Sequence, residues 1–221
     1  KESGDKVVSD LSDMNEAFSR MQAKIFGFVK SSSQVLRKYP ESNTSIAARY
    51  ARTVSYYNEG RLKDSLAEIN SLLLSSPADP YFLELQGQIL LGYGKISESI
   101  IAYQKASDVL PNEPLMLGGL AAAQIAGENP LLLKKAIANL KVALSRDQKY
   151  YEGWRQLAVA EGRLGNIGLS ALASAEQHMI NAEYANALRF SKQATRLLPR
   201  GSPGWIRAQD IENTIMILRT N

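Results

Sequence analysis

The sequence predicts an all-α fold, a solenoid of antiparallel helix hairpins. Proline and glycine recur at a spacing of 34 residues, the apolar residues between them repeat every three or four positions, and no alternating strand pattern of comparable length appears. A fixed period of this length is typical of stacked two-helix units, since each helix with its turn takes about 17 residues. The pairs that share the spacing are Pro77 and Pro111, Gly60 and Gly94, and Pro80 and Pro114.

The helix boundaries follow from the same prolines and glycines. Pro80, Pro114 and Pro203 each come directly after a turn residue, as expected of proline in the first position of a helix, where its missing N–H costs nothing. Glycine is favoured just past a helix end because it adopts positive φ, which predicts helix ends at Gly60, Gly94 and Gly165. The clearest amphipathic stripe between such signals is Ile96, Ile100, Tyr103, Ala106 and Leu110.

The repeat resembles the tetratricopeptide repeat (TPR), a helix-turn-helix unit that stacks into a superhelix. Residues 46–79 follow the same plan, with Thr53 at the small position of the first helix. Residues 80–113 match it best, through Gly87, Gly94, Tyr103, Ala106 and Pro111.

The later repeats depart from the regular period. Residues 114–150 keep the plan, but the turn in "AGENPLLLKKA" is three residues longer. Trp154 and Trp205 then lie 51 residues apart, which is one and a half repeats and predicts an extra helix. We therefore expect an irregular section over 151–199, with helices at 151–164, 168–181 and 184–198, and a capping helix over 202–221. The packing partner of the helix at 168–181 stays open.

The N-terminal residues predict a degenerate leading hairpin. A long helix is followed by the short segment "SSSQVLRKYP", so we place residues 1–40 in a linker or hairpin region and residues 41–221 in the solenoid. The long helix carries one apolar stripe, formed by Leu11, Met14, Phe18, Met21, Ile25 and Phe28.

Composition excludes several classes of function. The 26 basic and 22 acidic residues are interleaved, so the net charge of +4 predicts a solvated surface and no nucleic-acid partner. The longest apolar stretch, 115–126, is too short for a membrane span. Cysteine is absent and His178 is the single histidine. The sequence therefore predicts no catalytic residue, no metal ligand and no cofactor in this chain, and a packing or surface role for His178.

A groove along the first helices is the predicted partner site. In TPR proteins these helices line the concave surface, which binds a protein or peptide. The third repeat would add a small, apolar floor at Leu115, Gly118, Ala122 and Ile125. The alternative is that Tyr50 and Tyr57 pack against neighbouring helices. The groove positions are Tyr50, Val54, Tyr57, Tyr81, Glu84, Gln88, Leu91, Arg155, Val159 and Arg163.

A closer resemblance rests on longer strings. "RMQAKIFGFV", "YPESNTSIAARYARTVSYYNEGRLKDSLAEI", "PYFLELQGQIL" and "LLPRGSPGWIRAQDI" are similar to the C-terminal TPR region of bacterial HExxH zinc metallopeptidases of the BepA type. The resemblance implies a periplasmic protein that serves outer-membrane protein assembly. It also implies a zinc-containing peptidase domain upstream, in intramolecular contact with the repeats.

This chain contains no HExxH motif, so none of that family's catalytic residues can be assigned to it. We therefore expect a non-catalytic module that binds substrates or partners for the attached peptidase. A stand-alone TPR adaptor is the alternative, and an enzyme in its own right is a third.

Overall fold

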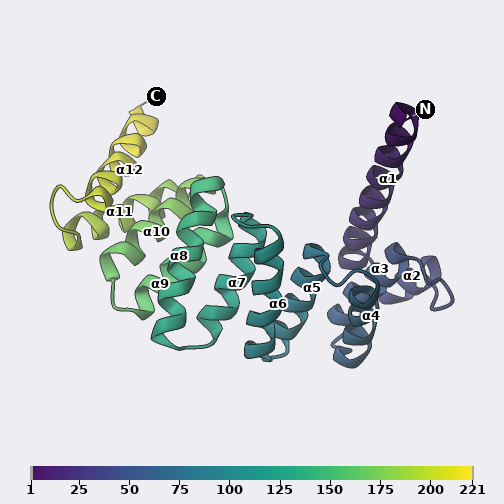
Figure 1. Cartoon of the computed structure of the whole chain (residues 1–221). Coiled ribbons are helices and arrows are strands. Elements are labelled where there is room, and N and C mark those ends of the chain that lie inside the picture. The colour runs from purple at the N-terminus through teal and green to yellow at the C-terminus, as the bar shows by residue number, and fades with distance from the viewer. Residues whose placement is uncertain (1, 221) are drawn as a thin grey trace. The chain divides into compact units, whose positions relative to one another are not determined.

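The computed structural model describes the backbone of residues 2–220 and the side chains of residues 14–218 (Figure 1). Every regular element in this part of the chain is an α-helix, as the sequence predicts. The helices are α1 (Glu2–Val29), α2 (Ser32–Lys38), α3 (Ile46–Asn58), α4 (Leu62–Ser75), α5 (Pro80–Gly92), α6 (Ile96–Val109), α7 (Pro114–Ala126), α8 (Pro130–Arg146), α9 (Tyr151–Arg163), α10 (Ile167–Ile180), α11 (Tyr184–Leu197) and α12 (Pro203–Thr220).

The predicted helix starts and ends are present. Pro80 and Pro114 lie in the first turns of α5 and α7, and the Asp79 carboxylate caps α5 by accepting hydrogen bonds from the backbone N–H groups of Tyr81 and Phe82. Glycines with φ between 73° and 80° end α3, α5 and α9, at Gly60, Gly94 and Gly165. Glycine adopts such backbone at the lowest cost, so these residues favour a helix end at each position.

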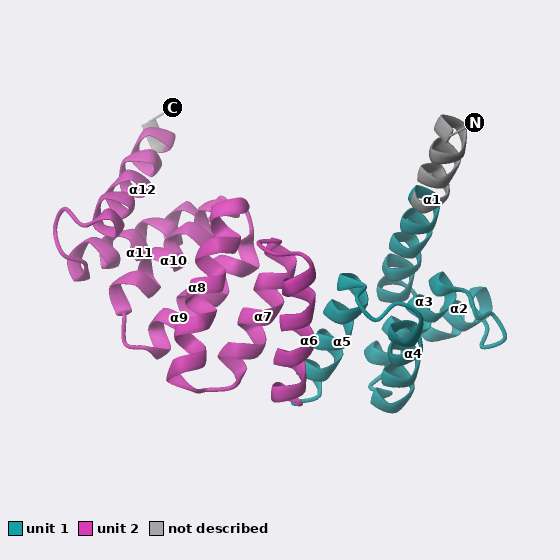
Figure 2. Ribbon diagram, viewed as in Figure 1, with its two compact units in different colours: residues 1–94 teal, residues 95–221 magenta. Residues whose placement is uncertain are grey.

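The helices form two compact units, residues 1–94 and residues 95–221 (Figure 2). The boundary near residue 40, between a leading hairpin and the solenoid, stays a prediction from the sequence. In the structure α1 and α2 pack against α3 inside the first unit. Helices α1 and α3 approach closely at Gly27, because this residue has no side chain. An added Cβ would lie 2.7 Å from the backbone oxygen of Ala51.

Unit 1 has its main core between α3, α4 and α5. Arg52, only 2 % exposed, fixes the loop before α3: its Nη1 donates to the backbone oxygens of Pro40 and Asn43, each at 2.8 Å, and its Nε donates to Glu68. The guanidinium is thus satisfied on several sides, as a buried charge must be. The core side chains are Tyr50, Val54, Ile69, Leu72, Phe82, Leu85 and Ile89.

Unit 2 has a larger core centred on α7, α8 and α9, and smaller clusters among α10, α11 and α12. Helices α6 and α7 meet at Gly119, where an added Cβ would lie 2.1 Å from the Tyr103 ring. Ala106, one of the residues that match the repeat pattern, is fully buried. The main cluster contains Ala121, Ile125, Leu133, Ala136, Ile137, Leu140, Leu144, Leu157, Ala160 and Ala173.

Helix α10 belongs to two hairpins at once. The turn from α9 to α10 has Gly165 at φ 80°, and the Asn166 N–H donates to the Glu161 carbonyl oxygen at 2.9 Å. The turn from α10 to α11 repeats this geometry, with Ala182 at φ 55° and a 2.9 Å hydrogen bond from the Glu183 N–H to the His178 carbonyl oxygen. Accordingly α10 packs on both α9 and α11, and also on α12.

This double role answers the question that the sequence left open. Helix α10 is the second helix of the hairpin that α9 begins and the first helix of the hairpin that α11 completes. The predicted segments 151–164, 168–181 and 184–198 agree with α9, α10 and α11 within one residue at each end. The 51-residue spacing between Trp154 and Trp205 therefore reflects one helix shared by consecutive hairpins.

Candidate functional site

In unit 1 the long helix α1 lies over part of the predicted groove. The Lys24 Nζ is 2.8 Å from the Glu84 carboxylate, and the Arg20 guanidinium is 2.6 Å from the Asp79 carboxylate. Glu84 is only 5 % exposed, so Lys24 neutralises a carboxylate that has little access to water. Two ion pairs thus join α1 to the start of α5 and the residue before it.

Aromatic contacts add to this packing. The Arg20 guanidinium lies 4.3 Å from the centre of the Phe82 ring. The Lys24 amine lies 5.8 Å from the centre of the Tyr50 ring. Tyr50 and Val54 are 3 % and 0 % exposed, and burial raises the pKa of the Tyr50 hydroxyl. These groove positions are covered by the chain's own helix, and a partner reaches them only if α1 moves.

The other predicted positions of unit 1 are more open. Tyr81 is 47 % exposed, while Gln88 and Leu91 are half-buried on α5. Tyr57 packs edge-to-face on Tyr93, with 6.2 Å between ring centres. The alternative interpretation, in which the groove tyrosines pack against neighbours, therefore describes both Tyr50 and Tyr57.

In unit 2 the predicted positions of α9 make local contacts. Arg155 forms a forked ion pair with Glu152 one turn earlier, and Arg163 Nη1 donates to the Ile125 backbone oxygen at 2.9 Å. Val159, between them, is 37 % exposed. At the predicted apolar floor, an added Cβ on Gly118 would lie 2.0 Å from the Tyr150 hydroxyl, so the tyrosine fills that space.

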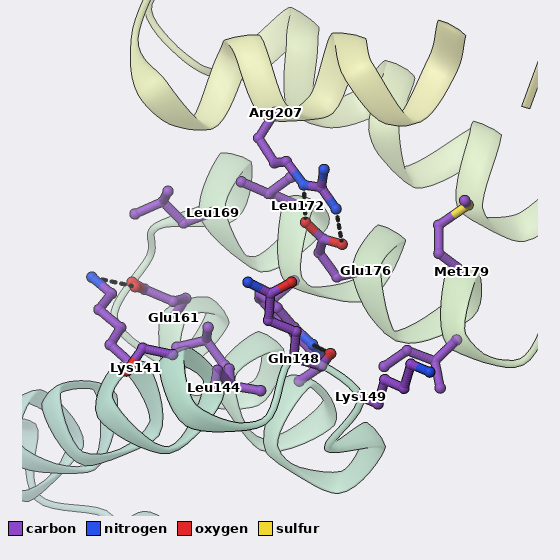
Figure 3. A pocket seen from close by; sticks show the side chains of 15 residues that line it. Lys141, Leu144, Gln148, Lys149, Glu161, Leu169, Leu172, Glu176, Met179 and Arg207 are labelled. Carbon is purple, nitrogen blue, oxygen red and sulfur yellow. Dashed lines mark hydrogen bonds and ion pairs between the residues drawn. The ribbon is translucent and has the colours of Figure 1, made fainter. Parts of the chain in front are cut away.

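A pocket of about 940 Å³ opens elsewhere on α9 (Figure 3). Its lining includes Trp154, Leu157 and Glu161 of α9 and none of the three predicted groove positions on that helix. Its volume falls within the range of ligand-binding cavities. The lining residues are Lys141, Leu144, Ser145, Gln148, Lys149, Trp154, Leu157, Glu161, Leu169, Leu172, Ala173, Glu176, Met179, Ile180 and Arg207.

The position of the pocket follows from the double role of α10. Helices α8 and α10 both pack on α9, and both contribute walls of the pocket. Since α10 also packs on α11 and α12, a residue of α12, Arg207, reaches the same pocket. Arg207 holds the Glu176 carboxylate of α10 through two hydrogen bonds of 2.5 Å and 2.9 Å, which raise the pKa of its guanidinium (Figure 3).

Sequence reasoning missed this pocket. The groove positions predicted on the helix at 151–164 include neither Trp154 nor Leu157, although both line the pocket. The available signal was the 51-residue spacing, because it marks the place where the repeat changes phase. In a regular repeat each unit presents the same surface to the next unit. Where the repeat changes phase, neighbouring helices present different surfaces, so the packing between them can leave a pocket.

His178 has a structural role. Its Nδ1 is 2.6 Å from the Glu183 carboxylate and its ring stacks on Phe190, with 5.4 Å between ring centres. The hydrogen bond from His178 is the main cause that lowers the pKa of Glu183. Among the residues that the structure describes, no three His, Cys, Asp or Glu side chains come together to hold a metal.

The described helices also include none that combines the length and apolar character of a membrane crossing. No protein-family model matches the chain. Among solved structures, MamA aligns with 76 % of this chain and 94 % of its own, at a TM-score of 0.56 and 13 % identity. A thermophilic TPR protein from Thermus thermophilus aligns with 72 % of this chain and 94 % of its own, at a TM-score of 0.49 and 18 % identity. The likeness to MamA concerns the fold alone.

The sequence is similar to curated proteins named beta-barrel assembly-enhancing protease. The Escherichia coli protein is 26 % identical over 195 residues, which are 85 % of this chain and 39 % of that protein. The Yersinia pestis protein is 26 % identical over 157 residues, which are 71 % of this chain and 32 % of that protein. The chain thus spans less than half the length of these relatives. This chain is therefore similar in sequence to part of the beta-barrel assembly-enhancing protease, and its fold is a TPR-like α-solenoid.

Proposed function

We propose that this chain is the protein-binding module of a longer protein, and that it holds substrates or partners for an attached zinc metallopeptidase. The observation that carries the proposal is the pocket of unit 2, which combines an apolar lining with an opening to solvent. Repeat proteins of this kind commonly bind other proteins through such surfaces. The module itself contributes binding, and the attached domain contributes the chemistry.

The link to a peptidase is supported by similarity over 85 % of this chain to a protein named as a protease. The zinc would be held outside this chain, since the chain has a single histidine and its described residues form no metal-binding cluster. The names of the relatives refer to beta-barrel assembly, from which we infer a periplasmic role in the quality control of envelope proteins.

A photocrosslinking experiment tests the binding role. A photoreactive amino acid is introduced in place of Ser145, an exposed residue at the pocket, in the full-length protein in its own host. We expect crosslinks to envelope proteins, above all outer-membrane β-barrels or their assembly factors. The matched control places the same amino acid at Lys105, an exposed position on α6, and should give no such crosslinks. Equal crosslinking from both positions would refute the binding role of the pocket.

The link to a peptidase has its own test. We expect the reading frame that encodes Lys1 to continue upstream through an HExxH motif and a signal peptide. A frame without them would support the stand-alone adaptor instead, and it would leave the binding role in place.

A further inference from the structure

The pocket of unit 2 has an unequal charge balance. Its lining contains three cationic side chains and two carboxylates. Both carboxylates are already engaged: Glu176 with Arg207, and Glu161 with Asn166, whose Nδ2 donates to it at 2.7 Å. Glu161 also forms an ion pair with Lys141, whose amine lies 3.7 Å from its carboxylate.

Lys149 takes part in neither of these ion pairs (Figure 3). It is an exposed residue in the turn between α8 and α9, and its backbone N–H donates to the Asp147 carboxylate at 2.9 Å. Asp147 is not among the lining residues. The turn is therefore held in place while the Lys149 amine remains available at the pocket.

The remainder of the lining is mainly apolar. Trp154 donates its indole N–H to the Gln148 backbone oxygen at 2.9 Å, so the ring needs no polar partner from a ligand. A large apolar side chain would bury surface here without leaving a polar group unsatisfied. The apolar lining residues are Leu144, Trp154, Leu157, Leu169, Leu172, Ala173, Met179 and Ile180.

We infer that this pocket binds an extended peptide segment that places one large apolar side chain in the pocket and an Asp or Glu side chain, two residues away, on Lys149. In an extended chain, side chains two positions apart point to the same side and lie roughly 7 Å apart. One short segment can therefore supply both groups. This inference rests on the proposed function and adds the chemistry of the partner.

Charge complementarity separates this occupant from others. A basic segment would meet a lining with an excess of positive charge and would be repelled. A purely apolar segment would bring the Lys149 amine into a drier environment without a counter-charge, which opposes binding. An acidic and apolar segment meets both demands.

Four short fluorescent peptides, blocked at both ends and mixed with the full 221-residue chain, provide the test. The first contains phenylalanine and, two positions later, aspartate. The second has asparagine for the aspartate, and the third has serine for the phenylalanine. The fourth is the asparagine peptide with a free C-terminal carboxylate. Binding is measured by fluorescence anisotropy at low and at high salt.

We expect the first peptide to bind about threefold to fivefold more tightly than the second at low salt, and this advantage to shrink at high salt. We expect no saturable binding of the third peptide. Lys149→Gln should remove the advantage of the aspartate while leaving the affinity for the asparagine peptide unchanged. Lys105→Gln, a change of the same kind on α6, should alter neither affinity.

Three results would overturn the inference: equal binding of the aspartate and asparagine peptides, an equal loss of both on Lys149→Gln, or tightest binding of the free carboxylate. Absence of binding by all four peptides would also overturn it. If crosslinking at Ser145 still captures envelope proteins in that case, the proposed function stands and only this partner chemistry fails. If peptides bind as expected but crosslinking gives nothing, the proposed function fails instead.

Discussion

The two units use the repeat fold in different ways. In unit 1 the chain's own helix α1 covers Tyr50, Val54 and Glu84, and ion pairs hold it there. In unit 2 an apolar pocket stays open beside α9, at the place where α10 serves two hairpins. The position of a residue within a repeat therefore does not determine whether its surface is available to a partner. What matters is which helix packs next to it.

The largest expected effect comes from separating α1 from α3. Gly27→Val places side-chain carbons against the Ala51 backbone oxygen, which cannot move without disturbing α3. We expect a loss of about 3 kcal/mol in the free energy of unfolding, measured by urea denaturation.

The matched control for this change is Gly162→Ala, where the nearest atom to a new Cβ is the Ser170 side-chain oxygen at 3.2 Å. Its effect should stay below about 1 kcal/mol, since alanine also favours the helix. An unchanged stability of Gly27→Val would contradict the close packing of α1 on α3.

The next effect concerns the ion pair beneath α1. Lys24→Met leaves the buried Glu84 carboxylate without its counter-charge, and we expect a loss of about 2 kcal/mol. Adding Glu84→Gln should recover part of this loss, because the neutral amide costs less to bury. Lys95→Met, which breaks an exposed ion pair with Glu98, is the control and should change stability by less than about 0.5 kcal/mol. Equal losses from Lys24→Met and Lys95→Met would contradict the description of unit 1.

A smaller effect is expected at the pocket of unit 2. Arg207→Met removes the partner of Glu176, but Arg207 is itself half exposed, so the loss should be about 0.5–1 kcal/mol. Arg155→Met, which breaks the exposed pair with Glu152, should cost less. Thermal melts followed by circular dichroism measure both. A larger loss for Arg155→Met would argue against Arg207 as the side chain that joins α12 to α10.

The smallest effect is a pH dependence at the α10–α11 turn. The hydrogen bond from His178 lowers the pKa of Glu183 below its ordinary value of 4.5. Stability from this carboxylate is therefore present above that value and is lost as the pH falls through the lowered pKa. Glu183→Gln should reduce the drop in Tm between about pH 6 and about pH 3. An unchanged drop in Tm for Glu183→Gln would contradict this role of the hydrogen bond from His178.

The sequence predicts the helices and their order well, because period and turn chemistry are local. Pro80, Gly94 and Gly165 mark the boundaries without any knowledge of the tertiary structure. The exposure of the groove positions is harder to predict, because it depends on a helix distant in sequence. Lys24 contacts Glu84, which lies 60 residues later in the chain. The pocket is harder still to predict, since residues from α8, α9, α10 and α12 form it together.

Helix α10 also limits how this architecture can be rearranged. A regular two-helix repeat can be transplanted as a cassette, because its two ends present equivalent surfaces to the neighbours. A junction at either end of α10 would separate it from α9 or from α11, so one of its two hairpins would lose a helix. Chimeras joined at the turn before α9 should therefore fold more readily than chimeras joined at Gly165 or Ala182.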